Sequence, residues 1–389
     1  MVKFDLVLVF SAPQRNCIFL EIIQKLSKKK SILVYPVAPS KKQVIRLAQT
    51  SQKFLAKCEA LGAKVGGYEE VSCKLMIIGQ RDFQLIEIQN LKKNITAQKV
   101  AWLSGLAMGN AQYENLYGLK VDYVFIPDLN FYRHRLSEFS TNGIKFLDEK
   151  LVEIGMPKFS VFDECFKSKR VDYLIAHPTP FSFSDEYDAY HYYKRLHTLV
   201  KALLSQRRTV VIKNHNADER GNYLINKNLK LFVRLLFWVK IEDKFLRAVD
   251  WMLHIGSSNK SKFVRLLVAS SINVLDRKIL RECAQLSDLT SHHGMNLELF
   301  LPYVQKGLIT GRSNSIWHGL FHKIPVVNLV DADTPYKHED KMHKVAMQYL
   351  DVHFSGHLEF NSTQFQVISE RTRKANITRV IKKILGSEN

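Results

Sequence analysis

This chain of 389 residues has few cysteines and no redox or zinc motif. The five cysteines are an odd number and none forms a CxxC pair; they are Cys17, Cys58, Cys73, Cys165 and Cys283. A disulfide framework and a structural zinc site are therefore not expected, and a reducing cytoplasmic environment fits best. The histidines are scattered as well, so we expect neither a bound metal nor another cofactor.

Long hydrophobic runs are also missing. A membrane-spanning helix needs about 20 apolar residues, and the closest stretch, 229–255, is interrupted by charged residues throughout. The apolar run at 4–10 is too short and too early for a signal peptide. These absences predict a cytoplasmic protein that is attached to a membrane, if at all, only at its surface.

Acidic residues are scarce relative to basic ones. There are 37 Asp and Glu against 57 Lys and Arg, a formal net charge of +20. Such a surface favours a polyanionic partner: nucleic acid, an anionic membrane or a phosphorylated substrate. The chain has no P-loop and no GxGxxG fingerprint after its first apolar run, so the common nucleotide-binding motifs do not choose among these partners.

Apolar runs alternate with helical spacing along the chain, which predicts parallel sheets flanked by helices. In the first half we expect strands at 6–10, 32–37, 75–78 and 121–126, and helices at 19–26, 41–61 and 96–108. In the second half we expect strands at 173–176, 209–212 and 272–275, and helices at 185–204, 297–305 and 372–385.

The predicted domains follow from this alternation. An N-terminal α/β domain spans 1–160, and a C-terminal α/β domain spans 170–370. The C-terminal domain carries a basic insertion at about 220–265, and a helix at 371–389 is expected to return to the first domain. The insertion mixes basic and aromatic residues, which suits either an amphipathic helix on an anionic bilayer or a core helix with a solvated basic face.

Residues 307–330 are the most informative stretch, because they predict a buried strand, a tight turn, a short helix and a second buried strand. The turn at 311–315 reads Gly-Arg-Ser-Asn-Ser, and its polar side chains can cap the helix or hold a phosphate. Arg312 adds a forked positive charge suited to phosphate oxygens. The alternative is a plain helix cap. In either case we expect Trp317, Leu320 and Phe321 of the following helix in the core.

Polar residues also follow other predicted strands, where parallel sheets bind ligands. His215 and Glu219 are candidates for acid–base chemistry, and Asp128 is a candidate catalytic carboxylate. Each of these can equally belong to an ordinary turn. The remaining candidates at strand ends are His177 and Lys213 in the second half, and Ser11, Gln14 and Arg15 in the first.

The second half, over roughly 171–340, resembles a family. Its motifs are His177-Pro-Thr-Pro180, Lys213-Asn-His215, the 311–315 turn and Lys323-Ile-Pro-Val326. In this order they are similar to the C-terminal half of GT-B-type glycosyltransferases. More narrowly, they resemble the group of CDP-glycerol glycerophosphotransferases and bacterial capsule Kdo transferases. The chain departs from that pattern at Asn216, where the group commonly has proline, and at Gly311 and Arg312, where an acidic residue is common.

The resemblance implies two Rossmann-like parallel-sheet domains facing a cleft. The second would bind the phosphates of a nucleotide donor, without a metal, through His177, Lys213, Arg312, Ser313, Asn314 and Ser315. The first would bind the acceptor near Ser11, Gln14 and Arg15. The leading candidate for the general base would be Asp128, with Glu219 and His215 behind it.

The implied reaction moves a sugar from a CMP-sugar or other NDP-sugar to a cell-surface polysaccharide or lipid-linked glycan, at the cytoplasmic face of the membrane. Two alternatives remain at this point. One is a basic nucleic-acid-binding protein, although no RNA-binding signature is present. The other is a non-catalytic α/β partner subunit.

Overall fold

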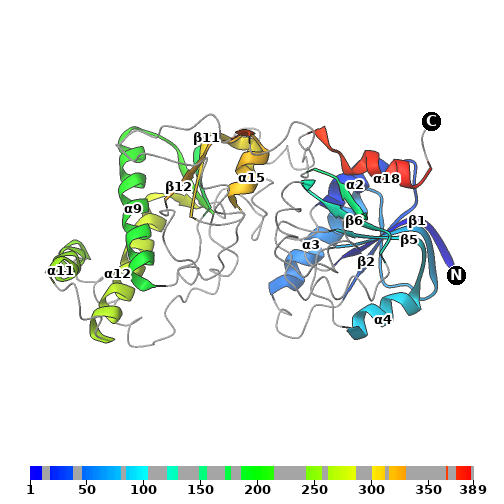
Figure 1. Cartoon of the computed structure of the whole chain (residues 1–389), viewed down its shortest axis with the longest axis horizontal. Coiled ribbons are helices and arrows are strands. Elements are labelled where there is room, and N and C mark those ends of the chain that lie inside the picture. The colour runs from blue at the N-terminus through cyan, green and yellow to red at the C-terminus, as the bar shows by residue number, and fades with distance from the viewer. Residues whose placement is uncertain are drawn as a thin grey trace. The chain divides into compact units, whose positions relative to one another are not determined.

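The computed structural model describes the sheets and most of their flanking helices; the described residues are 1–10, 18–37, 46–79, 85–103, 121–129, 149–155, 171–176, 185–213, 242–255, 262–285, 300–311, 315–329, 365–366 and 374–386. The chain forms two compact units (Figure 1). The first unit contains 1–165, 293–299 and 368–389, and the second contains 166–292 and 300–367.

The first unit is built on a parallel sheet of seven strands in the order β3-β2-β1-β4-β5-β6-β7. The chain therefore begins in the middle, builds outward to one edge and returns to build the other, as in doubly wound α/β proteins. The strands are β1 (Val2–Phe10), β2 (Ile32–Pro36), β3 (Lys64–Val65), β4 (Val71–Ile78), β5 (Ile95–Leu103), β6 (Tyr123–Ile126) and β7 (Leu151–Glu153).

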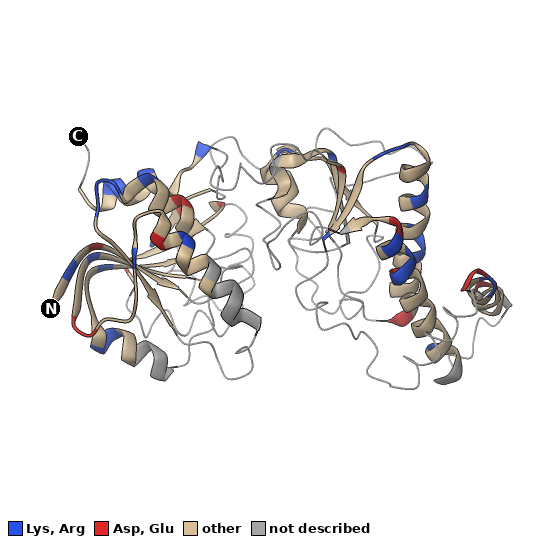
Figure 2. Ribbon diagram, turned by 180° about the vertical axis from the view of Figure 1, so that it is seen from behind, with Lys and Arg blue, Asp and Glu red and all other residues tan. Residues whose placement is uncertain are grey.

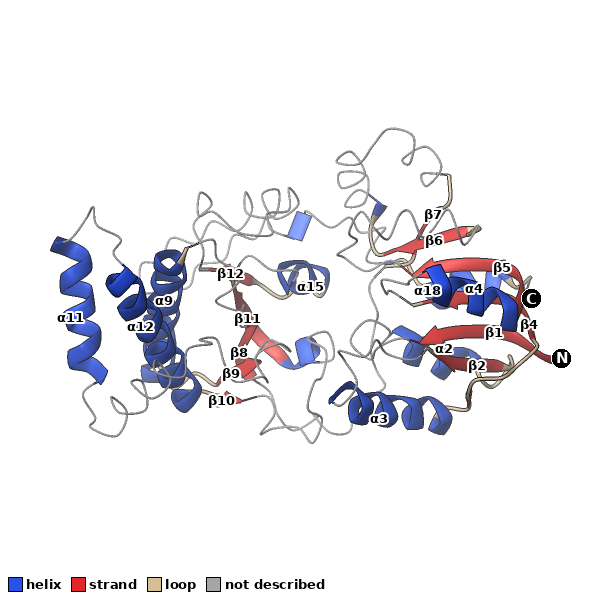
Figure 3. Cartoon of the chain, turned by 90° about the horizontal axis from the view of Figure 1, so that it is seen from below, coloured by secondary structure: helices blue, strands red, loops and turns tan. Residues whose placement is uncertain are grey.

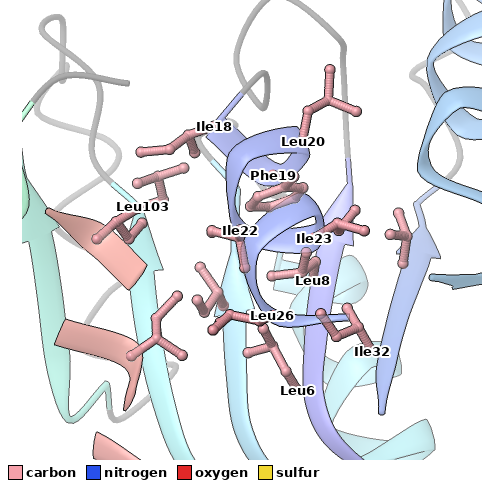
Figure 4. Packing of buried hydrophobic residues seen from close by; sticks show 14 of the residues in the cluster. Leu6, Leu8, Ile18, Phe19, Leu20, Ile22, Ile23, Leu26, Ile32 and Leu103 are labelled. Carbon is pink, nitrogen blue, oxygen red and sulfur yellow. The ribbon is translucent and has the colours of Figure 1, made fainter. Parts of the chain in front are cut away.

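Helices α2 (Ile18–Leu26) and α3 (Arg46–Ala60) pack on one face of this sheet. Alternate residues of β1, such as Leu6 and Leu8, meet the apolar stripe of α2 (Figure 4). The residues between them, including Val7 and Val9, point to the other face and are also fully buried. Because β1 is covered on both faces, its apolar run is continuous rather than alternating.

The chain's last described helix, α18 (Ile377–Ile384), joins the same core through Ile377 and Ile381. Asn376 caps its first turn, since its Oδ1 accepts hydrogen bonds from the backbone N–H groups of Thr378 at 2.9 Å and Arg379 at 3.4 Å. The C-terminal segment therefore packs on the first unit, beside α2.

The second unit contains a parallel sheet of five strands in the order β10-β9-β8-β11-β12. This is again an order that starts in the middle and builds to both edges. The strands are β8 (Val171–Ala176), β9 (Val210–Lys213), β10 (Ala284–Gln285), β11 (Val304–Thr310) and β12 (Val326–Asn328).

Helices cover both faces of the second sheet (Figure 3). On one face α9 (Glu186–Ser205) and α12 (Lys262–Glu282) pack together, with α11 (Glu242–Ile255) outside them. On the other face lies α15 (Ser315–Phe321), between β11 and β12 in the chain. The start of α9 is fixed by Asp185, whose Oδ1 accepts a hydrogen bond from the backbone N–H of Tyr187 at 2.7 Å.

The α/β class with parallel sheets is confirmed, but two predicted elements are wrong. Residues 96–103, expected to be helical, form β5. Consecutive residues 101–103 are buried, as in a central parallel strand, and such a run does not distinguish a strand from a buried helix. Residues 272–275, expected to form a strand, lie within α12, whose 21-residue length decides against a strand.

The helix predicted at 297–305 can be compared only in part. Residue 300 is helical and Leu301–Tyr303 form a 3-10 turn, after which β11 begins at Val304, so the predicted helix runs two residues too far. Residues 297–299 lie outside the described residues. The pattern also missed α4 (Leu85–Asn94) and the short strands β3, β7 and β10. Within the described ranges, no helix combines the length and the apolar character that spanning a membrane requires.

Candidate functional site

The second sheet changes direction between β8 and β11. From β8 the chain builds toward β9 and β10 on one side, and then returns to place β11 and β12 on the other. In open α/β sheets, ligands bind outside the carboxyl ends of the strands at such a switch point. The segments that leave the sheet there begin with His177, after β8, and with Gly311, after β11.

Four strands of this sheet end in one register row. Ala176 of β8 pairs with Lys213 of β9 on one side and with Thr310 of β11 on the other, and Thr310 pairs with Asn328 of β12. Neighbouring strands lie about 4.8 Å apart. The strand ends from Lys213 to Asn328 therefore span about 14 Å, and a cation, a hydroxyl and an amide lie along this edge.

Thr310 holds the switch point together. It is fully buried, and its Oγ1 donates a hydrogen bond to the carbonyl oxygen of Ala176 at 3.2 Å. Its own carbonyl accepts a hydrogen bond from the N–H of Leu329 at 3.1 Å. One residue thus links the carboxyl ends of β8, β11 and β12. Sequence reasoning missed it, although a polar residue between an apolar run and Gly311 was a visible signal.

Helix α15 approaches the sheet closely because it contains Gly319. A Cβ at Gly319 would lie 2.5 Å from Cγ2 of Val326 and 3.0 Å from Cδ2 of Leu308. Only glycine therefore lets the helix lie this close to β11 and β12. The sequence alone does not reveal the role of Gly319, because that role depends on how α15 packs against β11 and β12.

The predicted core side of α15 is confirmed, since Trp317, Leu320 and Phe321 are all buried. The helix has only seven residues, beginning at Ser315, which is partly exposed. So short a helix adds little dipole of its own. Any anion binding at the 311–315 turn must therefore rest mainly on side chains and on the local N–H groups of the turn.

Among the predicted donor-side residues, Lys213 and Ser315 belong to the described structure. Lys213 is the half-buried last residue of β9, and Ser315 is the first of α15; both interact with other residues. The other predictions on this side lie outside the described residues: His177, His215, Glu219, Arg312, Ser313 and Asn314. The chain nevertheless places His177 directly after Ala176, and Arg312 two residues after Thr310.

The first sheet has its own switch point, between β1 and β4. Val9 pairs with Ile78, and the N–H of Gly79 donates to the carbonyl of Val9 at 3.0 Å. The predicted acceptor segment begins one residue beyond β1. Its candidates Ser11, Gln14 and Arg15 lie outside the described residues.

Asp128 follows β6, which is separated from β1 by β4 and β5. Three strand spacings amount to about 14 Å, so the fold does not bring Asp128 beside the end of β1. The residue is only 2% exposed and interacts within the protein. A general base must reach the proton that it removes, so this burial lowers the rank of Asp128 as a base.

An ion pair lies at the opposite, amino edge of the second sheet. Asp172, near the start of β8, accepts a hydrogen bond from the N–H of Thr209 at 2.9 Å and pairs with Lys306 at 3.1 Å. Partial burial raises the pKa of Asp172, but these bonds outweigh burial and bring the pKa below its usual value. Asp172 and Lys306 are therefore both engaged in contacts that hold the sheet together.

Two other kinds of chemistry find no support in the described part of the chain. Burial raises the pKa values of Cys58, Cys73 and Cys283 to about 12, so these thiols are protonated at neutral pH and are not nucleophiles. No cluster of three or more His, Cys, Asp or Glu residues is arranged there to hold a metal ion.

Fold and strand ends together define a doubly wound α/β protein of two units, with its candidate site at the carboxyl edge of the second sheet. No protein-family model and no curated protein sequence matches the chain.

Several solved structures are similar to this chain over nearly its whole length. S. aureus MnaA with UDP is 12% identical, with a TM-score of 0.44 and coverage of 100% of this chain and 98% of that chain. The wall teichoic acid polymerase TagF with CDPG is 13% identical, with a TM-score of 0.43 and coverage of 98% and 88%. TcCGT1 with UDP is 8% identical, with a TM-score of 0.41 and coverage of 99% and 93%. Identities and scores this low do not transfer a function to this chain.

Proposed function

We propose that this protein is a GT-B-type glycosyltransferase. It would move a sugar from a nucleotide-activated donor, a CMP-sugar or another NDP-sugar, to a cell-surface polysaccharide or lipid-linked glycan. The observation that carries the proposal is the switch point of the second sheet, where Ala176, Thr310 and Lys213 end in one row. The segments carrying His177 and Arg312 leave the sheet from that row.

The chemistry of these segments suits a phosphate ester. Lys213 and Arg312 supply positive charge, and the hydroxyl and amide groups of Ser313, Asn314 and Ser315 supply hydrogen-bond donors. As the bond between sugar and phosphate breaks, negative charge grows on the leaving nucleotide. Fixed cations and donors aimed at that charge lower the barrier, and the proposal requires no metal for this step.

The acceptor would bind at the first unit, near Ser11, Gln14 and Arg15, and a general base would remove the proton from its attacking hydroxyl. His215 and Glu219 are the first bases to test, because they follow β9 beside the proposed donor site. Asp128 ranks behind them because it is buried. A lipid-linked or membrane-proximal acceptor would account for the net charge of +20 and would place the protein at the cytoplasmic face of a membrane.

Thermal shift with a panel of CMP-, CDP-, UDP- and GDP-linked donors tests donor binding. A ligand that binds only the native state at about 100 times its Kd stabilises that state by about 2.7 kcal/mol. We expect at least one donor to raise the melting temperature. Arg312→Ala should abolish this shift and leave the melting temperature of the free protein unchanged.

Arg208→Ala is the matched control, because Arg208 is exposed at the amino edge of the same sheet, just before β9. The control should keep the shift. A flat response to every donor would remove the support for the proposal, and an unchanged shift in Arg312→Ala would remove Arg312 from the site. Release of free nucleotide from a bound donor then measures turnover, and His215→Ala and Glu219→Ala should slow it without losing donor binding.

A further inference from the structure

Helix α11 presents a tryptophan to solvent. Trp251 is 66% exposed, whereas Trp102 and Trp317 are buried. Tryptophan is a large amphipathic side chain that is enriched where proteins meet the interface of a bilayer. An exposed tryptophan therefore calls for an explanation, and its neighbours on the helix provide one.

Two basic residues lie on the same face of α11. Lys244 and Arg247 precede Trp251 by seven and four residues, so all three share one stripe of the helix. All three are exposed. The Nε of Arg247 donates to the carbonyl of Asp243 at 3.3 Å, a bond within the helix that leaves the guanidinium on this face.

The acidic residues of α11 are all drawn into ion pairs with neighbouring helices. Glu242 pairs with Arg281 of α12 at 2.8 Å, and Asp243 pairs with Lys278 of α12. Asp250 pairs with Lys194 of α9 at 2.8 Å. It also accepts a hydrogen bond from the Oη of Tyr190 at 2.6 Å.

The pairs of the two aspartates favour their ionised form. The hydrogen bond and charge of Lys278 lower the pKa of Asp243. Partial burial raises the pKa of Asp250, but the hydrogen bonds from Lys194 and Tyr190 outweigh it and lower the pKa overall. The negative charges of α11 are thus matched by cations of α9 and α12. The exposed charges of Lys244 and Arg247 therefore make the electrostatic potential of the outer face of α11 positive.

The apolar side of α11 is already used. Val249 is buried in the core of the second unit, and Phe245 and Leu246 pack against that core. Figure 3 shows α11 as the outer layer over α12. The helix is therefore anchored on its inner side, and the face carrying Lys244, Arg247 and Trp251 is exposed.

We propose that this face of α11 docks on the surface of an anionic phospholipid bilayer. Lys244 and Arg247 meet the lipid headgroups, and Trp251 enters the interface between headgroups and acyl chains. This contact would hold the protein at the membrane where the proposed acceptor lies, and only in this respect does it rest on the proposed function. Among the described residues, Trp251 is the one exposed large aromatic, and a single anchor of this kind fits a bilayer better than a row of stacked bases.

Helix α18 gives a natural control surface. Its exposed face carries Arg379, Lys382 and Lys383, coloured blue in Figure 2, but none of the exposed large hydrophobic residues belongs to it. It is comparable to the α11 face in charge and lacks the interfacial anchor.

The test is co-sedimentation of the full chain with phosphatidylcholine vesicles, with and without phosphatidylglycerol, in the absence of nucleotide. We expect binding only to the vesicles that contain phosphatidylglycerol. Each basic residue at such a surface contributes about fivefold in affinity. Lys244→Ala/Arg247→Ala should therefore weaken binding on the order of 25-fold, and Trp251→Ala on the order of tenfold. Lys382→Ala/Lys383→Ala should change it less than threefold.

Tryptophan fluorescence gives an independent readout. Its emission should shift to shorter wavelength on binding to the anionic vesicles, and Trp251→Phe should remove that shift. Three results would overturn the proposal: equal binding to neutral and anionic vesicles, wild-type binding by the α11 variants, or salt-sensitive RNA binding without vesicle binding. Donor thermal shift is measured without vesicles, so either proposal can fail while the other stands.

Discussion

The two sheets are held in the same way at their amino edges. In the first unit, Asp5 near the start of β1 accepts hydrogen bonds from the N–H of Ser31 at 3.0 Å and from Lys74 at 2.9 Å. In the second, Asp172 near the start of β8 accepts from the N–H of Thr209 and pairs with Lys306. With strands counted in chain order, the first strand of each sheet is thereby linked to the residue before the second strand and to a lysine on the fourth strand.

The two sheets differ at their carboxyl edges. Near the ends of β1, β4, β5 and β6 one register row of the first sheet runs through Val9, Ile78, Trp102 and Val124, all apolar. The last row of the second sheet runs through Lys213, Ala176, Thr310 and Asn328, and most of it is polar. The aspartate contacts at the amino edges are therefore part of the scaffold that both sheets share. The polar carboxyl edge is specific to the second sheet, and the proposed donor site lies there.

The largest expected effect breaks the packing behind that edge. Gly319→Ala would push a methyl group to within 2.5 Å of the Cγ2 of Val326, which is fully buried. Overpacking of this kind costs about 1–3 kcal/mol. We expect the free energy of unfolding to fall by this amount, and hydrogen exchange of 304–329 to quicken while the first unit is unaffected.

Two further variants sharpen this prediction. Gly67→Ala, in the first unit, adds a methyl group with nothing within 4 Å and should be nearly neutral. In a Val326→Ala background the added methyl group of Gly319→Ala should cost much less, because the clashing Cγ2 is gone. An undiminished cost in that background would show that close packing is not why residue 319 is glycine.

Next in size, the amino-edge clamps should be equivalent in the two units. Asp5→Asn and Asp172→Asn each remove charge-assisted hydrogen bonds, and each should lower the free energy of unfolding by about 1–2 kcal/mol. Glu70→Gln serves as the control, because both partners of its ion pair with the N-terminal amino group are exposed, at 81% and 53%, and this pair should contribute less than about 1 kcal/mol. A loss confined to one unit would break the comparison between the sheets.

The same clamps predict an acid-dependent loss of stability. Burial raises the pKa values of Asp5 and Asp172, but hydrogen bonds and lysine charges bring both below their usual value. A lowered pKa contributes stability that is fully present above the unfolded value of about 3.9 and is lost as pH falls through the folded value. Denaturation between pH 2 and 6 should show this loss in the wild type and a smaller one in either Asn variant.

Sequence patterns were sufficient for the parts of the fold that local periodicity determines. The predicted run at 6–10 lies in β1, and the 307–330 stretch forms strand, helix and strand in the expected order. Patterns failed where tertiary burial hides the period: β5 is buried at consecutive positions, and 272–275 belong to a long helix. Strand order, and therefore the role of Thr310, depends on pairing between distant segments, which periodicity does not contain.

Thr310→Val gives the smallest effect and the sharpest test of the carboxyl edge. The change keeps the shape of the side chain and removes the hydrogen bond from Oγ1 to the carbonyl of Ala176, so the free energy of unfolding should fall by about 1 kcal/mol. The ends of β8 and β11, from which the segments carrying His177 and Arg312 continue, would lose this hydrogen bond between them. The donor-induced thermal shift should therefore shrink.

Thr310→Ser keeps the hydroxyl and should keep the shift, and Asp172→Asn should keep it too, although it destabilises the sheet at least as much. The donor-induced thermal shift would then depend on which edge of the sheet is altered, and not on how far the free energy of unfolding falls. The shift could instead decline with the free energy of unfolding in the Thr310 and Asp172 variants alike. In that case any destabilisation of the sheet would weaken donor binding, and the carboxyl row of the second sheet would have no special part in it.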